Sequence, residues 1–320
     1  MPIIKPRKKP ILIRKYEALL TRIHGRHPKR NFIESDYRKY NAGYLGELAT
    51  DYQLGFIDEK KFYILQDLKL TINNHKVQMD TLLLTKKCII LIETKNLNGH
   101  LIFEENKMTR NLNDKIEGFV NPLWQVQRQE YRMKQWFQQN YLRLLPIYSL
   151  IVISNPNTFF DTSKLPSHLS DKVIGIDALP WKIESIEKNI KNTLLNEADV
   201  RSYSKKLLLA HTPDDTNLLE KYDLLPDEVQ KGVRCPKCNR LPLPKVKNTW
   251  ACPNNCDNEK KSFIYTSLKD YALLFENKLT NQKCREFLLI PSRNTMTRIL
   301  HSLPKTGKGN TTQYFLPIED

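Results

Sequence analysis

The chain of 320 residues is long enough for two or three domains, and a hydrophobic share of 40% can supply folded cores. This composition excludes a wholly disordered protein. The sequence contains no apolar stretch near the roughly 18 residues that a membrane-spanning helix needs, and its basic first residues lack the apolar segment of a secretory signal. We therefore expect a cytoplasmic protein that is not embedded in a membrane.

The chain carries 51 basic and 35 acidic side chains, a formal net charge of +16, and the excess lies at its two ends. Residues 1–40 contain 12 basic and 3 acidic side chains, and residues 231–320 contain 16 and 7. Residues 41–230 contain 23 and 25. A charge needed only for solubility, which is the alternative explanation, would have no reason to avoid the middle. The distribution favours a polyanionic partner, either nucleic acid or an anionic membrane surface.

The hydrophobic pattern divides the chain into five segments. A basic N-terminal extension, residues 1–40, includes a short amphipathic helix near residues 12–23 with Arg14, Lys15 and Arg22 on its basic face. The other segments are an α/β domain over residues 41–195, a helical linker over 196–231, a cysteine-rich module over 232–266 and a C-terminal domain over 267–320.

The second segment predicts a mixed sheet with antiparallel and parallel neighbours. A helix is expected to open at Asn41 and end at Gly55, and Asn98-Gly99 predicts a turn that leads into a hairpin. The other expected elements are strands over residues 62–70, 76–85 and 88–95, the hairpin over 100–110, a helix over 121–140, and strands over 147–154 and 173–176.

Charged side chains stand beside apolar runs in two of these strands. Glu93 and Lys95 lie two residues apart and so share one face of their strand, and an antiparallel neighbour can place Asp80 beside Glu93. Two carboxylates alone would repel, and a divalent cation resolves that repulsion. Oxygen ligands without His or Cys favour Mg²⁺ or Mn²⁺ over zinc. A neighbouring lysine can then polarise an attacking water. The alternative is a set of ion pairs in a sheet without catalytic function.

Four motifs, together and in chain order, carry a resemblance that covers roughly residues 41–155. This region resembles the nuclease-related domain (NERD) family of the PD-(D/E)xK nuclease superfamily. The resemblance implies a restriction-endonuclease-like mixed sheet flanked by helices. It also implies metal-dependent hydrolysis of DNA phosphodiester bonds. Met79 and Leu97 depart from the family's usual residues in ways that concern packing only. The motifs are Gly43-x-x-Gly-Glu47, Gln78-Met-Asp80, Ile92-Glu-Thr-Lys-Asn-x-x-Gly99 and Asn121-Pro-x-x-Gln125.

The resemblance also implies a role for each polar residue of these motifs. Asp80 and Glu93 would hold Mg²⁺ or Mn²⁺, and Lys95 would activate water. Glu47 would support a second metal or orient Lys95, and Gln125 would fix the water or the scissile phosphate. The alternatives are that Glu47 is a solvated helix residue and that Gln125 is a helix-cap or structural amide.

Four of the six cysteines form two pairs. Cys235-Pro-Lys-Cys238 is followed by thirteen residues and then by Cys252-Pro-Asn-Asn-Cys256. Two such pairs have the spacing of a structural zinc site, which a small module uses in place of a large core. The module resembles a zinc ribbon. Its candidate contacts to phosphates and one stacking surface are Lys237, Arg240, Lys245, Lys247 and Trp250.

The last segment predicts two helices, over residues 280–289 and 293–302, a basic glycine-rich turn and a closing strand over 314–316. This order resembles a winged helix-turn-helix. The resemblance implies DNA contacts from the second helix and from the turn as a wing. A small helical protein-interaction domain is the alternative. The implied DNA-binding residues are Arg293, Asn294, Thr297 and Arg298 on the helix and Lys305 and Lys308 in the wing.

The leading hypothesis is a Mg²⁺- or Mn²⁺-dependent nuclease that its basic ends, zinc module and C-terminal domain hold on DNA. A non-catalytic DNA-binding or regulatory protein that retains the nuclease fold is the main alternative. RNA remains open as a substrate, because charge alone does not distinguish it from DNA. The membrane-surface alternative is weak, since no long basic amphipathic helix with bulky apolar anchors follows residue 40.

Overall fold

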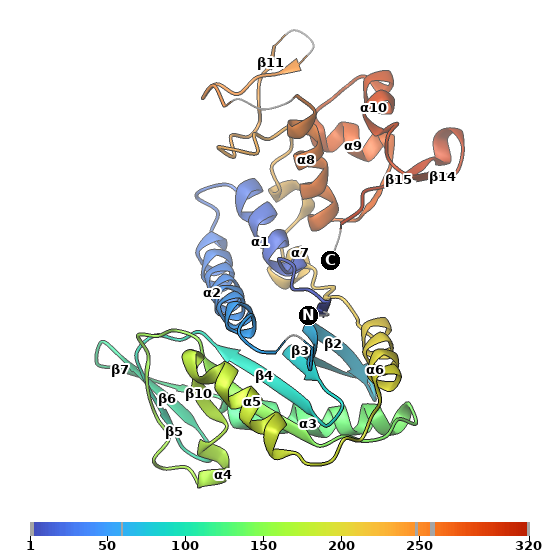
Figure 1. The fold of residues 1–320 in the computed structure, drawn as a ribbon. Helices are drawn as coiled ribbons and strands as arrows, with labels where there is room; N and C mark the ends of the chain where they lie inside the picture. Colours follow the sequence, from blue (N-terminus) through green and yellow to red (C-terminus); the bar gives the residue numbers. More distant parts are fainter. Residues whose placement is uncertain (1–2, 59, 247–248, 257–259, 319–320) are drawn as a thin grey trace. The chain divides into compact units, whose positions relative to one another are not determined.

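The computed structural model describes residues 3–58, 60–246, 249–256 and 260–318. The chain forms two compact units (Figure 1). Residues 1–8 and 41–213 make up the first unit, and residues 9–40 and 214–320 make up the second. No helix in the described part of the chain is long and apolar enough to cross a lipid bilayer.

A six-stranded mixed sheet forms the centre of the first unit, as the sequence predicts. Its order is β1-β2-β3-β4-β8-β10. The β2, β3 and β4 strands are antiparallel neighbours, whereas the β1–β2, β4–β8 and β8–β10 pairs are parallel. The bounds are Ile3–Lys5 (β1), Tyr63–Ile72 (β2), His75–Leu84 (β3), Ile89–Lys95 (β4), Ile147–Ile153 (β8) and Val173–Gly175 (β10).

Alternation along β4 distributes the apolar side chains between the two faces of this sheet. Ile90 and Ile92 join a core with Ile183 of α5, whereas Leu91 joins a second core with Trp136 of α3. The period of two is what places β4 between two helical layers. The helices of this unit, visible around the sheet in Figure 1, include α3 (Pro122–Gln139), α4 (Ser167–Ser170), α5 (Leu179–Asn189) and α6 (Glu197–Leu209).

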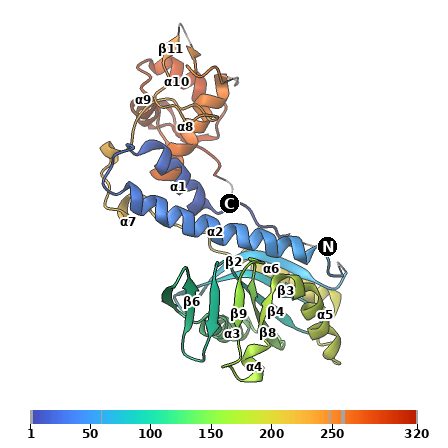
Figure 2. The same ribbon diagram turned by 90° about the vertical axis from the view of Figure 1, so that its left-hand side faces the viewer.

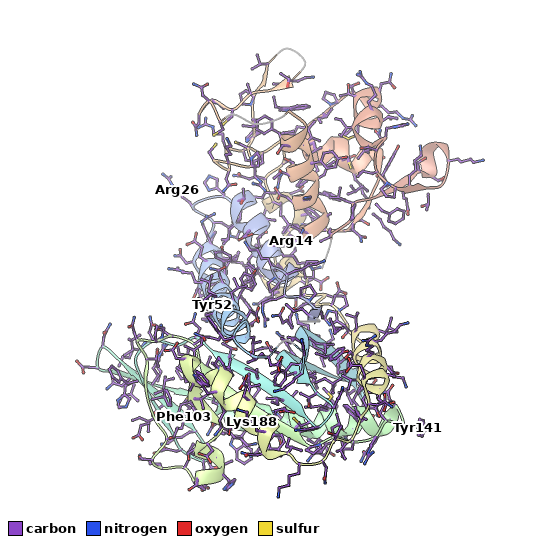
Figure 3. The ribbon with its side chains drawn as sticks, viewed as in Figure 1. Arg14, Arg26, Tyr52, Phe103, Tyr141 and Lys188 are labelled. Atoms are coloured by element: carbon purple, nitrogen blue, oxygen red, sulfur yellow. The ribbon has the colours of Figure 1, made fainter. Side chains whose placement is uncertain are left out.

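A second sheet, of order β7-β6-β5-β9, extends the predicted hairpin. The turn before it requires Gly99, whose φ is +104° and whose added Cβ would lie 2.5 Å from the Asn111 carbonyl oxygen. Phe103 of β5 is fully buried, whereas Tyr141, which follows α3, is exposed (both are labelled in Figure 3). The strands are β5 (His100–Phe103), β6 (Met108–Leu112), β7 (Lys115–Phe119) and β9 (Phe159–Asp161).

The helix expected from Asn41 ends as predicted but begins earlier. It is α2, Arg30–Leu54, a single helix in Figure 2. The prediction of its start was wrong because residues 30–40 contain no Gly or Pro to stop a helix. An ion pair between Arg30 and Glu34, 2.7 Å long and four residues apart, also supports the added turns.

The close approach of α2 to the end of β4 depends on Gly46. A Cβ at this position would lie 2.6 Å from Asn96 Cβ and 2.6 Å from Ser154 Oγ. We expect Gly46→Ala to lower the free energy of unfolding by about 1–3 kcal/mol because the added methyl group overpacks the core at this position. The control is Gly43→Ala, where a Cβ meets nothing within 4 Å and helix propensity favours Ala by about 1 kcal/mol. Urea denaturation of both variants tests this; equal effects would contradict the packing role of Gly46.

The second unit is built around α1 (Ile11–Arg22), the predicted N-terminal helix, and α8 (Lys260–Leu274). Spacing placed Arg22 on the basic face of α1, and this prediction was wrong. The Arg22 side chain is fully buried, its Nε donates to Asp270 Oδ2 at 2.8 Å, and its guanidinium lies 4.4 Å from the centre of the Phe287 ring. A buried acceptor on a distant helix makes this burial possible.

The last part of this unit contains the two predicted helices, each with a polar N-cap. Thr280 Oγ1 accepts from Lys283 N at 3.2 Å, and Ser292 Oγ accepts from Thr295 N at 3.2 Å. A small sheet of order β13-β15-β14 accompanies them. The bounds are β13 (Lys278–Leu279), α9 (Asn281–Leu288), α10 (Arg293–Leu300), β14 (Lys305–Thr306) and β15 (Gln313–Phe315); α7 (Leu218–Lys221), β11 (Lys245–Val246) and β12 (Thr249–Trp250) precede α8.

Candidate active site

The antiparallel pairing of β3 with β4 brings Asp80 next to Glu93, as expected. Thr81 pairs with Ile92, so the next position along the two strands sets Asp80 against Glu93. Asp80 Oδ2 accepts a hydrogen bond from the backbone N–H of Thr94 at 2.8 Å. Both carboxylates are buried, with 7% and 3% of their surface exposed. The strands therefore hold two acidic groups side by side and largely shielded from solvent.

Lys95 lies on the same face of β4 as Glu93 and contacts it directly. Its Nζ donates to Glu93 Oε1 at 2.7 Å and to Gln125 Oε1 at 2.9 Å. Gln125 reaches this position from the first turn of α3, which begins at Pro122 and is capped by Asn121. The Lys95 side chain is 24% exposed, whereas that of Glu93 is 4% exposed. The ammonium group is thus the more accessible member of the pair.

Sequence reasoning missed Gln129, one helical turn beyond Gln125. Its Nε2 donates to Glu93 Oε2 at 2.8 Å and to the Gln78 carbonyl oxygen at 2.9 Å. The Gln129 side chain is buried, and its Oε1 has no hydrogen-bond partner in the described part of the chain. The spacing of four residues between the two glutamines on one helix face was the signal that could have identified it.

Side chains on the opposite face of β4, and just after it, contact α2, the helix that carries Glu47. Thr94 Oγ1 lies 3.0 Å from Thr50 Oγ1, and Asn96 Nδ2 donates to the Ala42 carbonyl oxygen at 2.7 Å. These contacts hold the helix at the end of the strand that bears Glu93 and Lys95.

Glu47 pairs with a residue from the N-terminal segment, Arg7. Arg7 Nη1 donates to Glu47 Oε2, and Arg7 Nε donates to Asp51 Oδ2 at 2.7 Å. No hydrogen bond or ion pair joins Glu47 to Lys95 in the described structure. Charge composition identified residues 1–40 as basic but did not indicate that one of these side chains enters the site.

Two carboxylates of the site, those of Asp80 and Glu47, have raised pKa values. Burial, followed by the charges of Glu93 and Glu47, raises the pKa of Asp80 well above its usual range. Burial also raises the pKa of Glu47 to about 7, although the nearby Arg7 opposes this. Acidic groups that penalise one another's ionisation favour a bound cation.

The residues present fit a hard divalent cation. Two carboxylates, Asp80 and Glu93, supply oxygen ligands, and the unpartnered Gln129 Oε1 is a further buried oxygen on a side chain that contacts Glu93. Glu47 does not complete a compact three-carboxylate group with them: among the described residues only the cysteines form a set of three or more candidate ligands within 4.8 Å of one another. The arrangement therefore suits one ion at the two carboxylates.

Comparison with family models tests the resemblance over this region. Residues 42–154 match the model described as the nuclease-related domain. Residues 42–154 are a nuclease-related domain. The matched span contains Glu47, Asp80, Glu93, Lys95 and Gln125 and ends just after β8. No curated protein and no solved structure matches the chain. The match supports a nuclease-type hydrolase in general, with nucleic acid as the class of substrate.

The four predicted cysteines come together in the second unit. Their four sulfur atoms all lie within 4.8 Å of one another, and Cys238 Sγ is 3.4 Å from Cys252 Sγ. A backbone hydrogen bond from Arg240 lowers the pKa of Cys238 to about 6. This cluster of four thiols fits a tetrahedral zinc ion. Of the candidate phosphate contacts in the module, Lys247 lies outside the described residues.

The six residues predicted to bind DNA all lie at the surface of the second unit. Arg293, Asn294, Thr297 and Arg298 are exposed along α10, whereas Met296 and Leu300 on its other face are buried. Lys305 and Lys308 are also exposed. Thr297 Oγ1 accepts a hydrogen bond from Asn281 Nδ2 at 2.9 Å, so its hydroxyl already has a partner within the protein. Asn294 and Arg298 on this face of α10 suit an external partner better.

Proposed function

We propose that the protein is a Mg²⁺- or Mn²⁺-dependent nuclease that hydrolyses phosphodiester bonds in DNA. One observation carries the proposal: within a nuclease-related domain, Asp80 of β3 lies next to Glu93 of β4, and Lys95 contacts Glu93. This is the set of groups that a hydrolytic reaction at phosphate needs, namely ligands for a divalent cation and a positive group beside them.

In this proposal Asp80 and Glu93 bind the cation, which when bound polarises the phosphate and acidifies a water molecule. Lys95 positions the attacking water and stabilises the developing negative charge. Glu93 and Gln125 hold the Lys95 ammonium by hydrogen bonds of 2.7 and 2.9 Å, and Gln129 fixes the other oxygen of Glu93. As the water oxygen forms its bond to phosphorus, the bond to the leaving oxygen breaks. The proton that the water loses passes to the solvent, and the leaving oxygen takes up a proton from the solvent.

We further propose that residues 267–320 bind DNA as a winged helix. The order helix, strand, helix, helix, strand, strand and the sheet order β13-β15-β14 support this. The α10 helix would enter the major groove, and the segment with Lys305 and Lys308 would be the wing. The zinc ion at the four cysteines would have a structural role. The cytoplasmic location of the protein stays a prediction.

Loss of a single exposed arginine on α10 tests this part of the proposal. We expect Arg298→Ala to weaken binding to duplex DNA by about 1–3 kcal/mol and to reduce its salt dependence. The control is Lys269→Ala, which removes one exposed positive charge from α8 instead. Binding titrations of both variants at several salt concentrations provide the measurement. Equal losses in the two variants would contradict a specific role for α10.

A cleavage assay tests the activity itself. Supercoiled, linear and single-stranded DNA, with RNA as a fourth substrate, are incubated with the purified full chain in Mn²⁺ or in EDTA. We expect nicking or degradation of DNA with Mn²⁺ and none with EDTA. Retained DNA binding without cleavage of any substrate would favour a non-catalytic DNA-binding protein instead.

A further inference from the structure

Arg7 lies outside the matched span of residues 42–154, yet its side chain is part of the site. We propose that Arg7 is a permanent, protein-borne cation at Glu47 and Asp51, so that the site accepts one divalent ion, at Asp80 and Glu93, and not two. This inference rests on the proposed function and specifies the metal content of that same site.

Arg7 engages Glu47 Oε2 and the neighbouring oxygens that a second ion at Glu47 would use. Its side chain is 1% exposed. The guanidinium donates to Glu47, to both oxygens of Asp51, to the Asp80 carbonyl oxygen at 2.7 Å and to Thr81 Oγ1 at 3.1 Å. All of these acceptors are hard oxygens of the kind that Mg²⁺ and Mn²⁺ prefer. A metal ion beside Glu47 would have to compete for the same oxygens and would be repelled by the guanidinium.

The backbone holds Arg7 in this place. The β1 strand pairs in parallel with β2, with Lys5 opposite Leu65. Gln66 of β2 also holds the residues at and after the end of β1. Arg7 N donates to Gln66 Oε1 at 2.6 Å, and Lys5 Nζ donates to the Gln66 carbonyl oxygen at 3.0 Å. Residues 3–7 are thus packed into the first unit, and Arg7 is held through both its main chain and its side chain.

The charges explain why a cation is needed there at all. Glu47 and Asp51 are both largely buried, with 15% and 16% of their side chains exposed, and they lie on adjacent turns of α2. An arginine supplies one positive charge with donors in a planar fork, which suits two neighbouring carboxylates. It acts as a positioning residue, because it orients Glu47 and the Asp80 backbone and is not itself placed against substrate.

Counting bound Mn²⁺ tests the inference. The zinc-loaded full chain is titrated with Mn²⁺, and free Mn²⁺ is followed by electron paramagnetic resonance. We expect one bound ion in the parent, two in Arg7→Ala, and one again in the Arg7→Ala/Glu47→Gln double variant. Arg7→Lys, which keeps the charge, and Lys8→Ala, a change at the exposed neighbouring lysine, should each bind one.

The possible outcomes separate the inference from the proposed function. Two ions in the parent would overturn the inference and leave the nuclease proposal standing. One ion in Arg7→Ala would also overturn the inference. No Mn²⁺ in the parent would overturn the proposed function and the inference with it. If Arg7→Ala does not fold, the count in the parent and in Arg7→Lys still decides, since both must equal one.

Discussion

Replacing Lys95 with Met is expected to slow Mn²⁺-dependent DNA cleavage by about 10²–10³-fold while Mn²⁺ still binds. The ammonium group lies 2.7 Å from Glu93 Oε1, an oxygen of a proposed ligand. It is not a metal ligand, so its loss should affect the chemical step and not the affinity for the ion. Single-turnover cleavage rates and Mn²⁺ titrations of the same variant measure the two effects separately.

Glu93→Gln is the companion variant, because it should lose both properties. The amide removes a negative charge from the proposed ligand set and still fits between Lys95 and Gln129. The control is Lys115→Met, which removes a lysine that is 76% exposed at the surface of the same unit. Cleavage by Lys95→Met at the rate of this control would contradict the role of Lys95.

Removing the zinc ion is expected to unfold the cysteine module and to destabilise the second unit. Structural zinc sites contribute about 10–16 kcal/mol of binding free energy to small modules. Cys235 and Cys252 share one hydrophobic core with Val233, Leu243 and Phe263, so the loss of the ion exposes that core. Chelation, or Cys238→Ser, should lower the melting temperature of the full chain, which differential scanning calorimetry measures. Either change should also make residues 232–256 sensitive to protease.

The control for the zinc prediction is Cys284→Ala. Cys284 is buried in α9 and is not one of the four clustered cysteines. Its variant should retain one zinc ion per chain, measured by atomic absorption, whereas Cys238→Ser should retain none. An unchanged melting profile after complete removal of zinc would contradict a structural role for the ion.

The parts of the site that are local in sequence could be predicted. Glu93 and Lys95 share a face because a strand repeats every two residues, and Asp80 meets Glu93 because short turns join antiparallel strands. The turn between β2 and β3 is built from Asn73 and Asn74, both at positive φ, which is what two asparagines at this point of the sequence favour.

The parts that depend on long-range packing could not be predicted. Arg7 reaches Asp80 across 73 positions of sequence, and a basic segment looks the same whether its side chains are solvated or buried. Arg22 was misplaced for the same reason, since its partner Asp270 lies 248 positions away. In the sequence, Gln129 cannot be distinguished from a polar residue on the exposed face of a helix. Only the packing of α3 against β3 and β4 buries it. Side-chain partners of this kind are properties of the tertiary fold.

The central claim is that Asp80, Glu93 and Lys95 form one site for a hard cation. A crystal of the zinc-loaded full chain soaked in Mn²⁺ tests it most directly, through the anomalous scattering of manganese. We predict a single manganese peak in contact with the carboxylates of Asp80 and Glu93, and its loss in an Asp80→Ala crystal. A manganese peak elsewhere, or none at saturating Mn²⁺, would contradict the account.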